Sequence, residues 1–297
     1  MISIIICSRT KVISKDLSEN IQNTVGCNYE LIVIDNTENQ YSIFEAYNLG
    51  IEKSKGDYLC FVHDDILFHT QDWGTIIEGI FDNDKQIGLI GIAGAKSKTK
   101  MPSLWWSCPK EDKVASIIQH IPDRETERWN SGFEKESLVE VVVVDGVFMV
   151  LRSESRLRFS TEMTGFHNYD LNLSIECKKA GYTILATNEI LIEHFSLGTI
   201  KDEWMESSYE FYKLYKNSLP LNFEKNKRNK KQEIANALWF INECLKFQKY
   251  KMALAVWGKL FYLNPFLLFH VVYWKNNIKS NFNLIHFKVK NEKLKME

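Results

Sequence analysis

Two adjacent carboxylates interrupt an apolar segment of this chain. In the segment KGDYLCFVHDDILF, residues 55–68, Asp64 and Asp65 follow residues that suit a buried strand, and apolar residues resume at Ile66. Charged groups among apolar side chains are costly unless a cation or hydrogen bonds compensate them. Mg²⁺ and Mn²⁺ take one or two carboxylates and complete their shell with water and phosphate oxygens. The segment therefore predicts a divalent metal site, and the alternative is a polar turn without a ligand.

Other polar groups also follow predicted strands. In parallel α/β sheets, ligands collect at the carboxyl ends of the strands. The candidate residues are Ser8 and Arg9 after the strand 2–6, Asp35 and Asn36 after the strand 30–35, His63 after the strand 57–62, and Asp145 with Gly146 between two later strands. Neither the glycine pattern of dinucleotide-binding proteins nor that of P-loop proteins follows the first strand, which argues against both classes.

Strands and helices alternate in the part of the chain that must position these residues. Continuous β-branched runs predict strands over 2–6, 30–35, 57–62 and 87–94, and helices are predicted over 15–24, 42–54 and 169–181. Residues 96–110 are expected to form a long loop. The alternation predicts an α/β fold with a mainly parallel sheet flanked by helices.

The character of the sequence changes after Ser218. Residues 229–265 have the pattern of two amphipathic helices. Residues 252–274 are strongly apolar, but Lys259 and Asn264–Pro265 divide them into parts shorter than the roughly 20 residues of a membrane-spanning helix. We therefore predict one domain over residues 1–219 and a helical C-terminal region over 220–297, formed by a helix pair and a basic, aromatic tail.

Charge is distributed unevenly along the 297 residues. The formal net charge is −1, which gives no general attraction to nucleic acid. From Glu224 onward, however, 15 Lys and Arg stand against 5 Asp and Glu, a net charge of +10, so the preceding residues carry −11. A basic end on an acidic body indicates contact with an anionic surface, and the alternative is an ordinary solvated helix face.

The cysteines and the N-terminal residues bear on the compartment. Six cysteines are scattered without a CxxC pair, most of them in apolar runs, as expected for reduced cysteines of a cytoplasmic protein. The opening apolar run MISIIICSR is too short for a signal peptide.

The ordered segments ISIIICSR, ELIVIDN and EAYNLGIEKSKGDYLCFVHDD resemble the nucleotide-binding half of family 2 glycosyltransferases, which have the GT-A fold. The later segments GIAG, WW, VVDGVFMVLRSE, GFHNYDLNLSIECKKAGY and IEHFSLG resemble the bacterial subgroup associated with capsule and surface-polysaccharide synthesis. The resemblance covers about residues 1–219. It implies an inverting, metal-dependent enzyme that moves a sugar from a nucleotide sugar, a UDP-sugar above all, to a hydroxyl group.

The resemblance also implies residue roles. Asp65 would be the last residue of the D-x-D metal motif, in which His63 replaces the first aspartate, and His194 would complete the metal shell. The acidic pair that holds the catalytic base in relatives reads Tyr169–Asp170 here, so Asp170 would be the base. The implied nucleotide-sugar contacts are Ser8, Arg9, Asp35, Asn36, His63, Asp64, Asp65 and Gly146, and the implied metal, Mn²⁺ or Mg²⁺, would be held by Asp65 and His194.

The acceptor side is predicted from two adjacent tryptophans. Trp105 and Trp106 could stack on an acceptor sugar, with Asp145 beside them, and the alternative is ordinary loop packing. We expect a saccharide or lipid-linked saccharide as acceptor, no nucleic-acid partner, and a cytoplasmic enzyme at the inner face of the plasma membrane. The aromatic residues of the C-terminal region would contact the membrane, or they would instead pack this region onto the catalytic domain or form a dimer contact.

Two other functions remain open at this stage. A nucleotidyltransferase would also use carboxylates and a metal, but it normally carries a glycine-rich phosphate loop, which CSRTKVIS lacks. A non-catalytic scaffold of a polysaccharide assembly complex would have a decayed site, whereas Asp65, Asp170 and His194 are present.

Overall fold

The computed structural model describes residues 1–196, 198, 200–222 and 227–275. The chain divides into two compact units, residues 1–236 and residues 237–297. Helix α6 (Lys227–Lys246) runs through the division. The predicted domain boundary after residue 219 stays a prediction, and most of the predicted basic tail, residues 276–297, lies outside the described residues.

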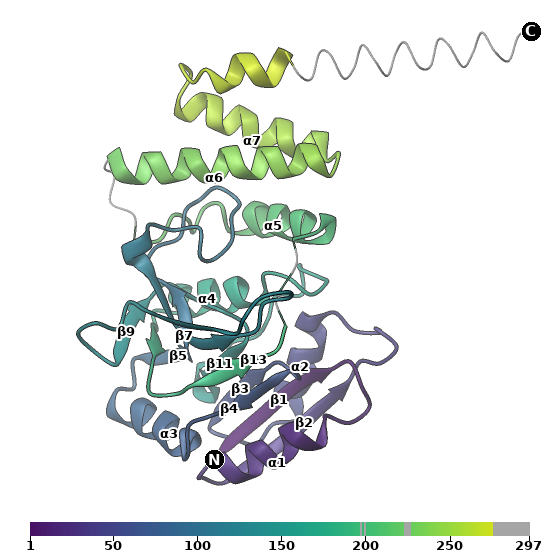
Figure 1. Ribbon diagram of the computed structural model, residues 1–297, viewed down its shortest axis with the longest axis vertical. Coiled ribbons are helices and arrows are strands. Elements are labelled where there is room, and N and C mark those ends of the chain that lie inside the picture. The colour runs from purple at the N-terminus through teal and green to yellow at the C-terminus, as the bar shows by residue number, and fades with distance from the viewer. Residues whose placement is uncertain (197, 199, 223–226, 276–297) are drawn as a thin grey trace, which may run out of the picture. The chain divides into compact units, whose positions relative to one another are not determined.

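The larger sheet of the first unit has seven strands in the order β2-β1-β3-β11-β5-β12-β9 (Figure 1). Their bounds are β1 (Ile2–Ser8), β2 (Tyr29–Asp35), β3 (Tyr58–Val62), β5 (Ile87–Gly91), β9 (Leu138–Val141), β11 (Phe148–Arg152) and β12 (Thr183–Thr187). The pairs β1–β2, β1–β3 and β5–β12 are parallel. The expected α/β fold is confirmed, but the sheet is mixed rather than mainly parallel, because β11 runs antiparallel between β3 and β5.

Helices cover both faces of this sheet. They are α1 (Lys15–Thr24), α2 (Ile43–Lys53), α3 (Trp73–Asn83) and α4 (Tyr169–Lys179), and α5 (Asp202–Tyr215) packs on α4 through the contact of Tyr215 with Asn172. Helix α2 begins where the sequence predicted because Ser42 and Glu45 form a capping box: the Glu45 carboxylate accepts a 2.8 Å hydrogen bond from the Ser42 backbone N–H. The predicted helices over 15–24 and 42–54 are thus confirmed.

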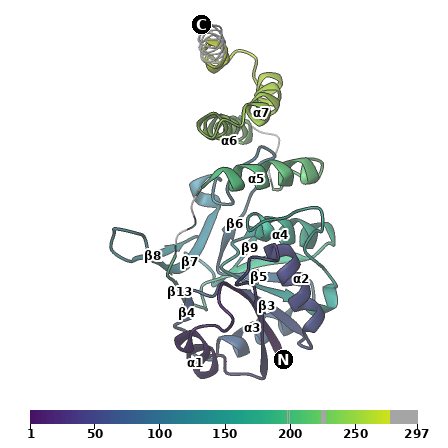
Figure 2. The same ribbon diagram turned by 90° about the vertical axis from the view of Figure 1, so that its right-hand side faces the viewer.

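Figure 2 shows helices on either side of the larger sheet, and alternate residues of the strands pack on these opposite layers. Ile5 and Phe61 belong to the apolar cluster that includes α2 and α4. Their neighbours Ile4 and Cys60 belong to the cluster that includes α1 and α3. Because both faces are buried, β1 and β3 consist of continuous apolar residues, which end abruptly where the sheet ends.

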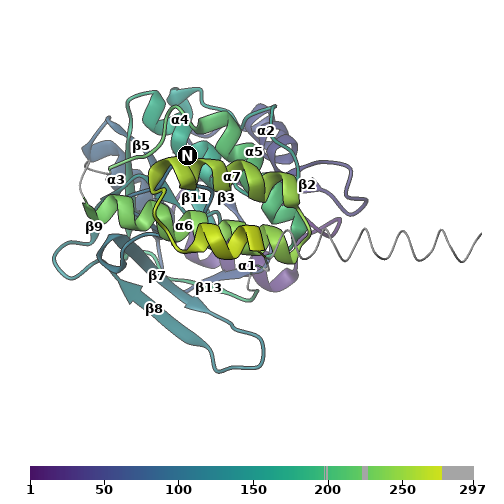
Figure 3. The ribbon, with the colours of Figure 1, turned by 90° about the horizontal axis from the view of Figure 1, so that it is seen from above.

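A second sheet has the order β10-β6-β7-β13-β4, with β8 paired to β7. Its strands are β4 (Ile66–Phe68), β6 (Ala93–Ala95), β7 (Lys113–Gln119), β8 (Glu127–Ser131), β10 (Val143–Val144) and β13 (Ile192–His194). Figure 3 shows β7 and β8 projecting as a ribbon from the first unit. The predicted strand 87–94 is in fact two strands, β5 and β6, one in each sheet. The segment 96–109 is a loop, as predicted.

The C-terminal unit contains the end of α6, helix α7 (Tyr250–Leu263) and a further helical segment over 269–275. The predicted helix pair is therefore confirmed. Phe240, Ile241, Ala253, Val256 and Leu260 are buried, as the amphipathic pattern requires. In the part of the chain that is described, no helix combines the length and apolar character that a membrane span needs.

Candidate metal and nucleotide site

The parallel strands bring three predicted site residues to one edge of the larger sheet. In the register of β1 and β2, Ser8 lies opposite Asp35. In the register of β1 and β3, Ile6 lies opposite Val62, so His63 follows at the same edge. The segment His63–Asp65 then connects β3 of the larger sheet to β4 of the second sheet.

His194, at the end of strand β13, lies beside the His63–Asp65 segment although it is distant in the sequence. It runs antiparallel to β4, with His194 opposite Ile66 and therefore next to Asp65. The backbone N–H of Phe195 donates to the Asp65 carbonyl oxygen at 3.1 Å, which ties the two segments together. On its other side β13 runs parallel to β7, with His194 opposite Gln119.

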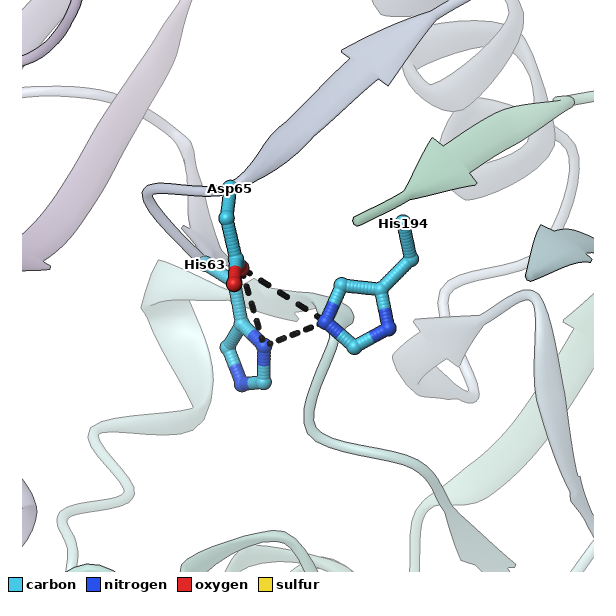
Figure 4. A group of neighbouring side chains, drawn as sticks. All are labelled: His63, Asp65 and His194. Atoms are coloured by element: carbon cyan, nitrogen blue, oxygen red, sulfur yellow. Dashed lines mark hydrogen bonds and ion pairs between the residues drawn. The ribbon is translucent and has the colours of Figure 1, made fainter. Parts of the chain in front are cut away.

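Three donor atoms converge at this junction (Figure 4). His63 Nδ1 lies 3.2 Å from His194 Nε2. Asp65 Oδ1 lies 3.5 Å from His194 Nε2 and 3.9 Å from His63 Nδ1. All three atoms fall within 4.8 Å of one another, so one cation could contact all of them. His63, predicted as a nucleotide-sugar contact, thus joins the two predicted metal ligands.

Hydrogen bonds fix the protonation of His194. The Gln119 amide Nε2 donates to the Ser196 carbonyl at 2.7 Å and to the His120 carbonyl at 2.9 Å, which orients its oxygen toward His194 Nδ1 at 3.0 Å. Since that oxygen only accepts, Nδ1 carries the proton and Nε2 presents a lone pair to the centre. A partner of this kind on the far ring nitrogen is typical of metal-bound histidine.

His63 is held in the same way. Its Nε2 lies 2.7 Å from the Tyr169 hydroxyl, and when Nε2 donates there, Nδ1 presents its lone pair. Two imidazole lone pairs and the Asp65 carboxylate then face one another without a proton between them, an arrangement that a cation relieves. Burial, together with neighbouring His194, lowers the pKa of His63, which favours the neutral imidazole that metal binding requires.

The two carboxylates of the HDD segment face different partners. Asp64 accepts hydrogen bonds from the Arg9 backbone N–H at 3.0 Å and from the Arg9 guanidinium at 2.5 Å. The same guanidinium reaches Asp65 Oδ2 at 3.2 Å, which leaves Oδ1 for the histidines. Burial acts to raise the pKa of Asp65, but the neighbouring side chains of His194 and Ser196 outweigh it and hold that pKa well below its usual range. Asp65 is therefore a charged carboxylate.

A pocket of about 370 Å³ opens beside the three donor atoms. Six of the predicted nucleotide-sugar contacts line it: Ser8, Arg9, Asn36, His63, Asp64 and Asp65. Aromatic rings of Tyr47, Phe166 and Tyr169 line it too, and the sequence did not indicate Phe166. Asp35 lies at the same strand edge, where its carboxylate accepts hydrogen bonds from the Thr37 backbone and hydroxyl.

Asp170 lies in the first turn of α4, where the helix dipole favours a carboxylate. The backbone N–H of Leu171 donates to its Oδ1 at 2.8 Å. Burial and the nearby charge of Asp145 raise the pKa of Asp170 to about 7. A carboxylate with a pKa near neutrality is suited to accept a proton from a hydroxyl group.

The predicted acceptor residues lie close together. Trp105 is buried and donates its indole N–H to Asp145 Oδ2 at 2.5 Å, and the Val147 backbone N–H donates to Asp145 Oδ1 at 2.9 Å. Trp106 remains 41% exposed, with its ring at 86° to that of Trp105. Trp105 is thus anchored, and Trp106 presents the more accessible ring of the two.

Gly146 has a steric role. A Cβ at this position would fall 2.2 Å from the Tyr169 hydroxyl oxygen, so only glycine lets Tyr169 approach and reach His63. Its predicted part in donor binding stays a prediction.

The loop over residues 96–109 is fixed by the first turns of α6. Glu233 accepts hydrogen bonds from the backbone N–H groups of Lys100 at 2.7 Å and Met101 at 2.9 Å. Asn236 donates to the Thr99 hydroxyl at 2.8 Å and to the Ser107 carbonyl at 2.9 Å. These bonds hold both arms of the loop that carries Trp105.

Besides Phe166, sequence reasoning missed two residues that support the site. Gln119 ends the apolar strand β7, the same signal that marked Ser8 and Asp35, and it could have been found in this way. Glu233 lies within a Lys-rich helix, and nothing in its sequence context indicates contact with the loop 96–109.

Comparisons with known proteins identify the family. A sequence model described as "Glycosyltransferase like family" matches residues 3–190. A protein of Fuscovulum blasticum, "ATP synthase subunits region ORF 6", is 23% identical over 198 residues, which are 64% of this chain and 73% of that protein.

Solved structures show the fold. The crystal structure of GalNAc-T7 with UDP, GalNAc and Mn²⁺ matches with a TM-score of 0.51 and 11% identity over 72% of this chain. This chain spans about half of that protein, 48% of its length. The likeness confirms the expected GT-A-like fold. The structure of A197 from STIV, with a TM-score of 0.38, is too distant to add to this.

Proposed function

Because this chain belongs to the glycosyltransferase-like family, we propose that it transfers a sugar from a UDP-sugar to a hydroxyl acceptor with inversion at the anomeric carbon. The observation that carries this proposal is the convergence of His63, Asp65 and His194 beside a pocket at the carboxyl edge of the sheet. A pocket of about 370 Å³ lies in the range of small-molecule sites, roughly 300–1,000 Å³.

The donor set supports Mn²⁺ more than Mg²⁺. Mg²⁺ is held almost entirely by oxygen atoms, whereas two imidazoles and one carboxylate suit a transition metal. GalNAc-T7, the structural neighbour, was crystallised with UDP and Mn²⁺. A bound cation would supply charge stabilisation for the leaving diphosphate.

Other residues of the chain would position the metal ligands, accept the proton and bind the acceptor. Arg9 keeps Asp64 and Asp65 in place, and its largely exposed guanidinium adds a positive charge at the pocket wall. Asp170 takes the proton of the acceptor hydroxyl as that oxygen attacks the anomeric carbon. A single displacement from the face opposite the leaving group inverts that carbon. Asp145 and Trp105 shape the acceptor side.

The proposal extends to the acceptor substrate and to the location of the enzyme in the cell. We assign a saccharide or lipid-linked saccharide acceptor in surface-polysaccharide synthesis, supported by the accessible ring of Trp106. A cytoplasmic enzyme agrees with six cysteines that are all free.

A donor screen tests the proposal. The purified protein is incubated with a panel of UDP-sugars and Mn²⁺, and UDP release is measured with and without oligosaccharide acceptors. We expect slow metal-dependent hydrolysis of one donor, faster release with the right acceptor, and a product whose anomeric configuration, read by NMR coupling constants, is opposite to that of the donor.

The Asp65→Asn variant is the control, since it removes one charge of the donor set and should lose the reaction. A retained anomeric configuration would contradict the inverting mechanism alone. No release from any donor would favour the non-catalytic scaffold.

A further inference from the structure

Exposed apolar side chains are concentrated in the C-terminal unit. Of the 15 large apolar side chains that are exposed in the described part of the chain, nine lie between residues 250 and 274. We call them the C-terminal apolar face: Tyr250, Leu254, Phe261, Tyr262, Phe266, Leu268, Val271, Val272 and Trp274. Soluble proteins rarely leave so many such side chains in one short region without a partner.

Helix α7 presents these side chains in a stripe. Tyr250, Leu254 and Phe261 recur at intervals of four and seven residues, which places them on one side of the helix. The buried residues of α7, Ala253, Val256 and Leu260, lie on another side. The apolar stripe therefore remains after the helix has packed its own core face.

The turn and the helical segment that follow add further exposed apolar side chains. Phe266 is 95% exposed, and Leu268 is 79% exposed. In the helical segment 269–275, Val271 and Val272 are exposed three and four residues after Leu268. The ring of Trp257 stacks on Tyr273 at 5.6 Å and meets Trp274 edge-on at 5.1 Å, which holds this segment against α7.

The charge around the face has one sign. Between Lys249 and Lys275 the sequence contains four lysines and no aspartate or glutamate. Lys251, Lys259 and Lys275 are exposed, and Lys251 lies beside the α7 stripe. The sequence beyond Lys275 adds five lysines and two glutamates.

We propose that the C-terminal apolar face docks on an anionic lipid surface. Amphipathic helices with apolar and aromatic residues bordered by lysines lie in the headgroup region of membranes. A symmetric dimer through the same face is the other occupant to consider, but it would bring identical surfaces together. Lysines would then oppose lysines with no carboxylate between residues 249 and 275 to pair with them. Anionic headgroups satisfy both the apolar and the cationic part of the face.

Vesicle sedimentation tests this proposal with the full-length chain. The probes are phosphatidylcholine vesicles with and without one third phosphatidylglycerol, at low and high salt. We expect pelleting with anionic vesicles at low salt and a large loss at high salt, because salt screens exposed charges. The Lys251→Gln/Lys275→Gln variant should lose about five-fold in partitioning for each lysine, as expected for charges at an anionic surface.

The apolar part of the face is tested by Tyr262→Ser/Phe266→Ser/Leu268→Ser, which changes only exposed side chains. This variant should lose at least ten-fold in partitioning while its circular dichroism and melting temperature stay unchanged. The matched control is Val12→Ser, which removes a side chain 75% exposed in the first unit and should pellet like the wild type.

Three outcomes would overturn the proposal: no pelleting at low salt, equal pelleting with neutral vesicles, or full pelleting of the triple variant. Sedimentation equilibrium without lipid completes the test. A dimer that the triple variant dissociates would assign the face to a second copy instead. Because the readout is lipid binding, its failure would leave the proposed transfer reaction untouched, and the reverse also holds.

Discussion

His63 Nδ1 lies 3.2 Å from His194 Nε2, although 131 residues separate the two along the chain. Each ring is turned by a bond on its far nitrogen, to Tyr169 in one case and to Gln119 in the other. When His63 Nε2 and His194 Nδ1 are the donors in these bonds, both lone pairs face Asp65. The geometry is that of a site prepared for a cation.

Removing one of the three donor groups should abolish metal-dependent nucleotide binding. For Asp65→Asn and His194→Ala we expect little change in circular dichroism and loss of the Mn²⁺-dependent part of UDP affinity in calorimetry. Glu193→Gln is the matched control, because Glu193 precedes His194 but bonds His69 and His120 instead. Wild-type Mn²⁺ dependence in Asp65→Asn would reject the metal site.

Gln119→Met should lower the metal affinity although Gln119 is not one of the three donor residues. The substitution removes the oxygen that holds His194 Nδ1, and losing such a partner typically costs 10–100-fold in metal affinity. Mn²⁺ titration followed by electron paramagnetic resonance measures the change. Unaltered affinity would show that the Gln119 contact does not orient His194.

Gly146→Ala should displace Tyr169, because the new methyl group would fall 2.2 Å from the Tyr169 hydroxyl oxygen. His63 would then lose its partner, and Mn²⁺ affinity should fall. Tyr169→Phe, which removes only the hydroxyl, should reproduce much of this loss. If Gly146→Ala weakened binding and Tyr169→Phe did not, Gly146 would act through the pocket and not through His63.

Asp170→Asn should lower transfer by the roughly 10²–10⁴-fold expected for a lost acid–base group, with UDP binding retained. In the wild type, transfer should rise with pH through about 7, where Asp170 loses its proton. The free energy of unfolding, in contrast, should fall as the pH rises. The folded pKa of about 7 exceeds the ordinary value of 3.8, so the folded state binds more protons between these values and loses stability as pH rises through them.

Melting temperatures separate this effect from a structural one. Near pH 4, Asp170→Asn should have the same melting temperature as the wild type. At pH 8 its melting temperature should be higher, because the wild-type carboxylate is then charged beside Asp145. A variant that is less stable at both values would contradict the raised pKa.

Glu233→Ala should act on the acceptor through the loop that carries Trp105. Without the bonds to the backbone of Lys100 and Met101, the loop 96–109 loses one anchor. We expect a higher KM for the acceptor and unchanged donor hydrolysis. Glu233→Gln, which keeps one acceptor oxygen, should restore part of the effect. Equal losses in donor hydrolysis and transfer would assign Glu233 to stability alone.

The sequence by itself determined the elements that carry the site. Apolar runs fixed β1 and β3, and Ser42 with Glu45 fixed the start of α2, because burial on two faces and capping are local requirements. Polar residues at the strand ends indicated Ser8, Asp35 and Asp65, since parallel strands end at the same edge of a sheet. The family resemblance and the matched residues 3–190 agree with that pattern.

Only the tertiary structure decided which of the candidate side chains lie in contact with one another. Strand β11 lies antiparallel between β3 and β5, and β13 lies between β4 and β7, and neither pairing follows from the order of the strands along the chain. The register of β13 places His194 beside Asp65 and opposite Gln119. A strand of three residues has almost no register preference of its own, so this meeting is set by the packing of both sheets.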